Sequence, residues 1–202
     1  YTCGIDVGTG FTKVVVVGTK GKSEPEVLAT GISETRGVHL GYIFNVDDVA
    51  LSIKKAVNQA ENTLGSKIRK AHVSIGGASL GGAISNGSVI IAKADQEITN
   101  LDVNRVLSNS EEGLDKLNKK IIHTIPIGYK LDGRDVYSRP EGLVGNKLEV
   151  KTLFITCLKQ NLEDLITAFA LAKIDIEEIV ASPISLSNIL LNSKQKTAGC
   201  IL

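Results

Sequence analysis

Three apolar stretches near the amino terminus predict the first strands of a sheet, because they are rich in β-branched residues. They cover residues 3–6, 11–18 and 26–33. The middle stretch contains four consecutive valines, and a run without polar alternation is expected of a strand that is covered on both faces. We therefore expect the middle stretch to lie inside the core.

An amphipathic helix is predicted next, because apolar residues recur every three to four positions over residues 46–64. Asn45 provides an N-cap, and Gly65 provides a stop signal. A short apolar strand that ends in paired glycines follows over residues 71–77. The order of three strands, a helix and a strand favours an α/β layer over a helix bundle.

Beyond about Leu80 the pattern changes to a Gly-rich strand, a helix and two more strands, which predicts a compact inserted α+β unit. Thr99 and Asp102 form a capping box at the start of its helix. Pro126 pushes the following strand towards a sheet edge or a bulge. An amphipathic helix over residues 161–175, a strand and a short helix then restore the α/β pattern.

The composition argues against several kinds of partner. The chain has 202 residues, of which 43% are hydrophobic, and its 23 basic and 22 acidic side chains leave a net charge of +1. This balance gives no reason to expect a nucleic-acid partner. No apolar run approaches the 18 residues of a membrane span. The chain begins without methionine and ends within an apolar stretch that predicts a new strand from Lys194, so we expect a piece of a longer protein.

The cysteines and histidines do not indicate a metal site, because they are scattered rather than grouped at ligand spacing. We expect the cysteines to be buried thiols in a reducing compartment. We expect the histidines to lie on the surface or to have satisfied partners. The residues concerned are Cys3, Cys157, Cys200, His39, His72 and His123.

The loop D-V-G-T-G-F-T-K between the first two predicted strands is the strongest candidate for a binding site. Its glycines allow backbone amides to face an anion, and its threonines add hydroxyl donors. Lys13 supplies a positive charge for a phosphate, and Asp6 suits a hydrated Mg²⁺ held through water. An ordinary tight hairpin is the alternative, and the loop alone does not decide between them. The candidate cofactor-binding set is Asp6, Gly8, Thr9, Gly10, Phe11, Thr12 and Lys13.

The chain resembles the actin, heat-shock chaperone and hexokinase superfamily in its strand–loop–strand–strand–helix order and in the spacing of this loop. The stretches HTIPIGYKLDG and GLVGNKLEVKTLFITC, residues 123–133 and 142–157, resemble the small extra subdomain of the FtsA family of bacterial cell-division proteins. Residues 35–61 are similar to the same family. The resemblance implies an α/β, actin-like (ribonuclease H-like) subdomain with an inserted α+β subdomain, cut before the second lobe.

The resemblance also implies a subdomain map. Residues 1–80 and 160–191 would form subdomain IA, residues 81–159 would form the inserted subdomain IC, and residues 192–202 would begin subdomain IIA. The family's second phosphate loop and its membrane-targeting carboxyl-terminal helix would then lie beyond this chain.

The function that the resemblance implies is that of a scaffold. It would bind ATP and Mg²⁺ through the loop from Asp6 to Lys13, and it would polymerise on the cytoplasmic face of the inner membrane at the division site. It would link FtsZ and later division proteins to the membrane, and it would self-associate through subdomain IC.

Other functions of the superfamily stay open. They are a small-molecule kinase, a chaperone-type ATPase and a pilus-assembly relative of FtsA. The short helix over residues 183–191 offers serine and asparagine where many actin-like ATPases carry glutamine or glutamate. No catalytic residue is therefore assigned, and ATP hydrolysis is left open.

Overall fold

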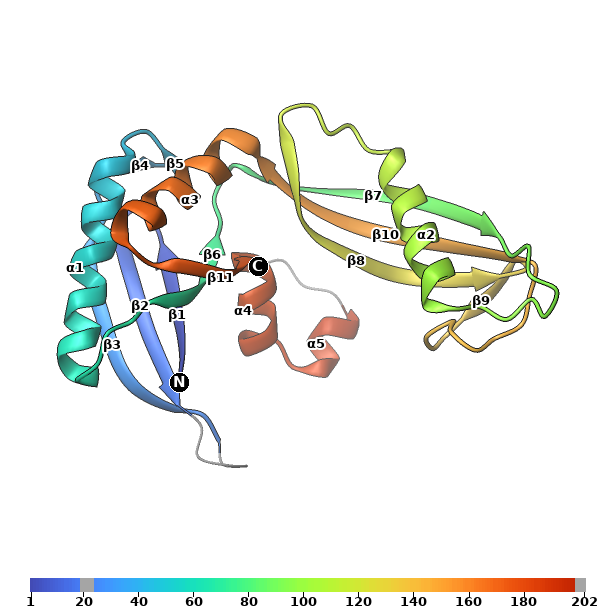
Figure 1. Cartoon of the computed structure of the whole chain (residues 1–202), viewed down its shortest axis with the longest axis horizontal. Coiled ribbons are helices and arrows are strands. Elements are labelled where there is room, and N and C mark those ends of the chain that lie inside the picture. Colours follow the sequence, from blue (N-terminus) through green and yellow to red (C-terminus); the bar gives the residue numbers. More distant parts are fainter. Residues whose placement is uncertain (19–23, 199–202) are drawn as a thin grey trace. The chain divides into compact units, whose positions relative to one another are not determined.

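The computed structural model of the chain describes residues 1–18 and 24–198 (Figure 1). It divides into two compact units. Unit 1 comprises Tyr1–Leu80 and Cys157–Leu202, and unit 2 comprises Gly81–Thr156. The chain therefore leaves unit 1 once, builds unit 2 and returns. Among the described helices, none has the length and apolarity needed to cross a bilayer.

Unit 1 is built on a five-stranded mixed sheet with the strand order β11-β6-β1-β2-β3. β1 pairs with β2 and β2 pairs with β3 in antiparallel fashion, whereas β1, β6 and β11 run parallel. The strands are β1 (Thr2–Val7), β2 (Phe11–Gly18), β3 (Glu26–Glu34), β6 (Lys70–Ile75) and β11 (Asp175–Ala181). A two-stranded hairpin, β4 (Val38–His39) and β5 (Tyr42–Ile43), stands apart from this sheet.

Two helices, α1 (Val46–Leu64) and α3 (Lys159–Ala172), contact each other, and α1 packs on β2 and β3. The predicted caps of α1 are confirmed: the amide of Asp48 donates to Asn45 Oδ1 at 3.1 Å, and Gly65 adopts a left-handed conformation. At Gly31 a Cβ atom would lie 1.9 Å from the carbonyl oxygen of Ala56. Only glycine therefore lets α1 approach β3 this closely.

The valine run of β2 is covered on one face only in the described part of the chain, which differs from the prediction. Val14 and Val16 are fully buried beneath the helices, but Val15 retains 39% of its exposure. The reason is the alternation of a strand: successive side chains point to opposite faces. Val15 belongs to the face that α1 and α3 do not cover.

Two short helices close the described part of unit 1: α4 (Ser182–Leu190) and α5 (Ser193–Ala198). The prediction of a strand from Lys194 is wrong over the described residues. The Asn192 and Gln195 side chains each accept a hydrogen bond from the other's backbone amide, at 2.9 and 3.0 Å, which starts a helix.

Of the three cysteines, Cys200 lies outside the described residues. Cys3 and Cys157 are buried free thiols, and burial raises the pKa of each to about 11.

Unit 2 is a four-stranded sheet with the order β7-β10-β8-β9 and one helix, α2 (Asn100–Glu112). Its core joins Ile91, Ile98, Val103, Val106, Leu148 and Val150. β9 pairs with β8 only from Tyr129 onward, so Pro126 lies beyond that pairing, in agreement with its poor fit inside a sheet. The strands are β7 (Leu80–Ile90), β8 (Lys119–Leu131), β9 (Arg134–Val136) and β10 (Lys147–Leu158).

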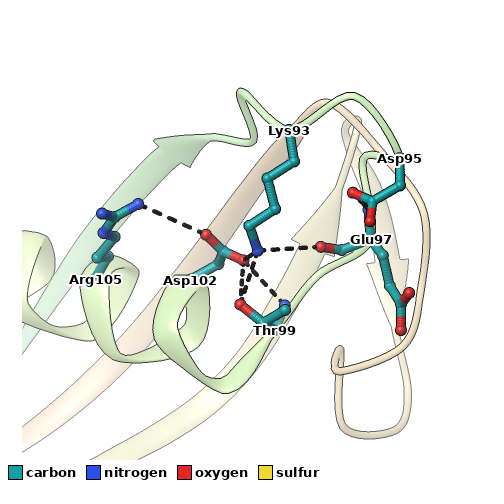
Figure 2. Close-up of polar contacts among 6 residues, drawn as sticks. All are labelled: Lys93, Asp95, Glu97, Thr99, Asp102 and Arg105. Atoms are coloured by element: carbon teal, nitrogen blue, oxygen red, sulfur yellow. Dashed lines mark hydrogen bonds and ion pairs between the residues drawn. The ribbon is translucent and has the colours of Figure 1, made fainter.

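The start of α2 carries a dense polar cluster, which Figure 2 shows. The predicted capping box is confirmed, with Thr99 donating to Asp102 through its backbone amide (3.0 Å) and its hydroxyl (2.7 Å). Lys93 adds an ion pair to the same carboxylate. Asp102 is only 2% exposed, and hydrogen bonds from Lys93 and Thr99 hold its pKa well below its usual range.

Candidate functional site

Unit 1 has a cavity of about 790 Å³ on the face of its sheet that α1 and α3 leave uncovered. Residues of β1, β2 and β6 form its floor, and residues of α4 line one side. The wall is mixed, with Val15, Leu186 and Ile189 as apolar members. A cavity of this size, with few polar groups among apolar ones, is typical of a small-molecule site.

The predicted phosphate loop is the turn of the β1–β2 hairpin. In the antiparallel register Asp6 faces Lys13, and Val7 faces Thr12. The amide of Gly8 donates to the carbonyl oxygen of Phe11 at 3.1 Å, which closes the turn. The hairpin interpretation therefore describes the backbone correctly, and it commits the Gly8 amide to the turn rather than to a ligand.

Four of the seven predicted residues line the cavity: Asp6, Gly8, Thr9 and Lys13. Gly10 is at the exposed tip of the turn, and a Cβ atom built there would meet no atom within 4 Å. Phe11 is 53% exposed and is not among the residues that line the cavity. The structure thus brings the two ends and the first half of the loop together at the cavity.

Thr12 lies on the opposite side of the sheet from the cavity. It is fully buried, and its hydroxyl oxygen is 2.8 Å from the hydroxyl oxygen of Thr35. The strand alternation explains this placement, since Thr12 shares its face with Val14 and Val16. The expected role of Thr12 as a hydroxyl donor to phosphate therefore does not fit, and Thr12 joins β2 to the end of β3 instead.

Asp6 and Lys13 are the charged pair at the cavity. They are directly opposite on adjacent strands, where Cβ atoms are about 4.5–5.5 Å apart. Asp6 is half-buried, and its Oδ1 atom accepts a hydrogen bond from the Ser74 hydroxyl. Lys13 is exposed. A carboxylate that suits a hydrated cation and a cation that suits a phosphate therefore face the same space, so the donor set fits a magnesium nucleotide.

A second group of contacts supports the loop from the side. The amide of Gly41, between β4 and β5, donates to Thr9 Oγ1 at 3.2 Å. Gly41 has φ +82°, Gly77 has φ +86°, and a Cβ atom on either would lie 2.8 Å from the other's Cα. The paired glycines that follow β6 thus pack against the β4–β5 turn, which in turn contacts the β1–β2 hairpin through Thr9.

The sequence did not single out Ser74, although a signal was present. His72 and Ser74 are two of the three polar positions of the alternating β6 strand, and both line the cavity. The contact between Ser74 and Asp6 depends on the parallel register of strands 68 residues apart, which alternation alone does not supply. The His72 side chain lies beside two carboxylates of β11: Nδ1 is 3.3 Å from Glu178 Oε2, and Nε2 is 3.6 Å from Glu177 Oε2.

Comparison with known proteins shows what the chain is similar to. Residues 77–156 match the SHS2 domain inserted in FtsA. The cell division protein FtsA of Bacillus subtilis is 31% identical over 198 residues, a match that covers 98% of this chain and 45% of the relative. FtsA of Pseudomonas aeruginosa is 26% identical over 202 residues, covering 98% of this chain and 47% of the relative.

Along almost its whole length the chain is similar to cell division proteins of the FtsA family. It spans about half the length of the curated FtsA relatives that it matches. Its fold is also similar to that of a chain in the solved PilM-PilN type IV pilus biogenesis complex, with a TM-score of 0.63 and 14% identity over 93% of this chain and 49% of that chain. The predicted actin-like α/β fold with a small inserted subdomain is therefore confirmed.

Proposed function

We propose that this chain is the nucleotide-binding part of an FtsA-type cell-division scaffold, with ATP and Mg²⁺ held at the β1–β2 hairpin. The observation that carries the proposal is the placement of Asp6 and Lys13 opposite each other at the cavity of unit 1. The similarity to FtsA supports the cell-division role, because the curated relatives are cell division proteins.

Lys13 and the tip of the hairpin would contact the phosphates. Lys13 is exposed at the cavity and brings a compact positive charge. Thr9 adds a hydroxyl, and the open space beside Gly10 leaves room for a phosphate next to the backbone. Since the Gly8 amide already donates to Phe11, we assign no phosphate contact to it.

Asp6 would hold Mg²⁺ through water rather than directly. The Asp6 carboxylate would not contact the phosphate oxygens, because both groups are negative. It would contact the ion through a water molecule, because Mg²⁺ keeps several of its waters in protein sites. When bound, the ion would neutralise charge on the phosphates. ATP would then act chiefly as a structural ligand that favours one assembly-competent conformation of the scaffold.

The wider role follows from the family and remains part of the proposal. Residues 1–80 and 160–191 would form subdomain IA, residues 81–159 would form subdomain IC, the self-association module of a filament, and residues 192–202 would begin subdomain IIA. The filament would lie on the cytoplasmic face of the inner membrane at the division site. It would link FtsZ and other division proteins to the membrane through parts of the protein outside this chain. The match of residues 77–156 to the inserted domain of FtsA favours this role over a kinase or a chaperone-type ATPase.

A Lys13→Ala variant of the full-length protein tests the nucleotide site. We expect its affinity for a fluorescent ATP analogue to fall roughly 10- to 100-fold, the range for losing a hydrogen bond to a charged group. Lys55→Ala is the matched control, because Lys55 is an exposed lysine of α1 that does not line the cavity. Equal affinity of Lys13→Ala and the parent protein would refute the assignment of the loop.

A further inference from the structure

Ser74 joins the row of residues that crosses the cavity floor. In the parallel register of β1 and β6, Ser74 is the partner of Asp6, and in the antiparallel register of β1 and β2 the partner of Asp6 is Lys13. Three adjacent strands therefore place Lys13, Asp6 and Ser74 side by side on the face that lines the cavity. Asp6 is the central member of this row.

The hydrogen bond between Ser74 and Asp6 has a defined direction. An ionised carboxylate can only accept, so the Ser74 hydroxyl donates its one proton to Asp6 Oδ1. The other oxygen, Oδ2, lies towards the loop, where a Cβ atom built on Gly8 would be 3.7 Å from it. The bond thus fixes which carboxylate oxygen is used by the protein and which one remains beside the loop.

We infer that Ser74 is the positioning residue of the metal site: it fixes the Asp6 carboxylate so that Oδ2 is presented to the hydrated Mg²⁺ of the bound nucleotide. This inference rests on the proposed function. It adds a residue from a strand remote in sequence to the loop that carries the nucleotide.

The row also shows what Ser74 prevents. Asp6 and Lys13 are opposite charges on directly paired positions, a geometry that favours a cross-strand ion pair. In the part of the chain that the structure describes, these two residues form no ion pair. By holding Asp6 on the β6 side, Ser74 keeps the carboxylate for the cation and the Lys13 ammonium for phosphate.

If Ser74 served only the fold, removing its hydroxyl would lower the stability of the protein rather than the effect of Mg²⁺ on nucleotide binding. The side chain faces the cavity, whereas its neighbours Val73 and Ile75 are buried in the core. Removing the hydroxyl leaves the core packing intact, and Asp6 can take up water in its place. The loss should therefore appear in the metal dependence of binding and not in folding.

The experiment measures the affinity of the full-length protein for a fluorescent ATP analogue, once with saturating Mg²⁺ and once with EDTA. In Ser74→Ala we expect the affinity with Mg²⁺ to fall about tenfold or more, the usual effect of removing a residue that orients a metal ligand. The affinity with EDTA and the thermal unfolding midpoint should match those of the parent. Ser33→Ala, which removes a hydroxyl that donates to Glu34 on β3, is the matched control.

A second pair of variants separates the hydroxyl from the shape of the side chain. Thr and Val have nearly the same volume and both suit a strand, so Ser74→Thr should keep the Mg²⁺ effect and Ser74→Val should lose it. If the ratio of the affinity with Mg²⁺ to the affinity with EDTA were the same in Ser74→Ala, Ser74→Val and the parent protein, the inference would be overturned, while the proposed nucleotide binding would stand. An equal loss with Mg²⁺ and with EDTA would also overturn it. A parent protein that binds no nucleotide under either condition would instead refute the proposed function, and with it this inference.

Discussion

Two aspartates, one in each unit, show how the same side chain serves structure in one place and is available for binding in another. Asp102 is 2% exposed. Its carboxylate forms an ion pair with Lys93, accepts two hydrogen bonds from Thr99 and lies 3.9 Å from the Arg105 guanidinium (Figure 2). Asp6 is half-buried, faces a cavity and accepts one described hydrogen bond, from Ser74. The carboxylate of Asp102 is fully used by the fold, whereas that of Asp6 keeps an oxygen for a ligand.

The cluster around Asp102 also explains why unit 2 begins its helix where it does. Lys93 lies in the segment between β7 and α2, and its ammonium donates to Thr99 Oγ1 at 2.8 Å and to the Glu97 carbonyl at 3.4 Å. The lysine thereby ties the incoming segment to the first turn of the helix. The negative charge of Asp102 is also favourable at the positive end of the helix dipole.

The largest expected effect comes from breaking the structural aspartate. Asp102→Asn removes the charge that Lys93 and Thr99 share, and we expect α2 to lose about 2–3 kcal/mol of stability against local unfolding. Amide hydrogen exchange of α2 in the full-length protein measures this loss. Glu111→Gln is the control, since its pair with Lys116 is exposed and should contribute less than about 1 kcal/mol. Nucleotide affinity should not change, and a loss of affinity comparable to that of Lys13→Ala would contradict the comparison.

The matching change at the other aspartate should have the opposite profile. In Asp6→Asn the Mg²⁺-dependent part of nucleotide affinity should fall about tenfold or more, because the amide carries no charge for the hydrated cation. Hydrogen exchange in β1 and β6 should stay close to that of the parent. Strong destabilisation of these strands with unchanged Mg²⁺ dependence would make Asp6 a structural residue like Asp102.

Acid should weaken the structural cluster in a defined pH range. The pKa of Asp102 is lowered in the folded protein by its hydrogen bonds with Lys93 and Thr99. Its contribution to stability is therefore complete above the ordinary aspartate pKa of about 4 and is lost as the pH falls below it. The difference in α2 exchange between the parent and Asp102→Asn, corrected for the intrinsic rate, should shrink by roughly 1 kcal/mol per pH unit below 4. A difference that stays constant from pH 7 to pH 3 would contradict this cause.

The smallest expected effect concerns the tip of the hairpin. Gly10→Ala adds a methyl group to space that is open in the structure, so the thermal unfolding midpoint should change little. If phosphate occupies that space, affinity for ATP should still fall by a few-fold, about 1 kcal/mol. Gly4→Ala is the comparison variant: Gly4 lines the cavity, whereas Gly10 does not, and a Cβ atom built at Gly4 also meets no atom within 4 Å. If Gly10→Ala and the parent protein bound ATP with equal affinity, the proposed position of the phosphates beside Gly10 would be wrong.

Local signals in the sequence were sufficient for much of the fold. Asn45 and Gly65 bound α1 because a cap and a left-handed stop act within one helical turn. The Thr99 and Asp102 pair likewise fixed the start of α2. The end of the described chain was misread because the apolar stretch after residue 198 outweighed the capping pair Asn192 and Gln195.

The candidate site was only partly predictable, for two different reasons. Thr12 could have been excluded from the loop's donors, since alternation places it with Val14 and Val16 on the face away from Lys13. The Ser74 contact could not have been found in this way. It depends on the register of β1 against β6, and a register between distant strands is set by the packing of the whole sheet.

The most direct test of the nucleotide site is a crystal structure of the full-length protein with a non-hydrolysable ATP analogue and Mn²⁺ in place of Mg²⁺. The anomalous signal of Mn²⁺ locates the ion independently of the nucleotide. We predict that the ion lies one water molecule away from the Asp6 carboxylate, with the Lys13 ammonium on the phosphates and the Ser74 hydroxyl still bonded to Asp6. A nucleotide bound elsewhere, or an Asp6 carboxylate turned to pair with Lys13 beside an ion-free cavity, would contradict the account.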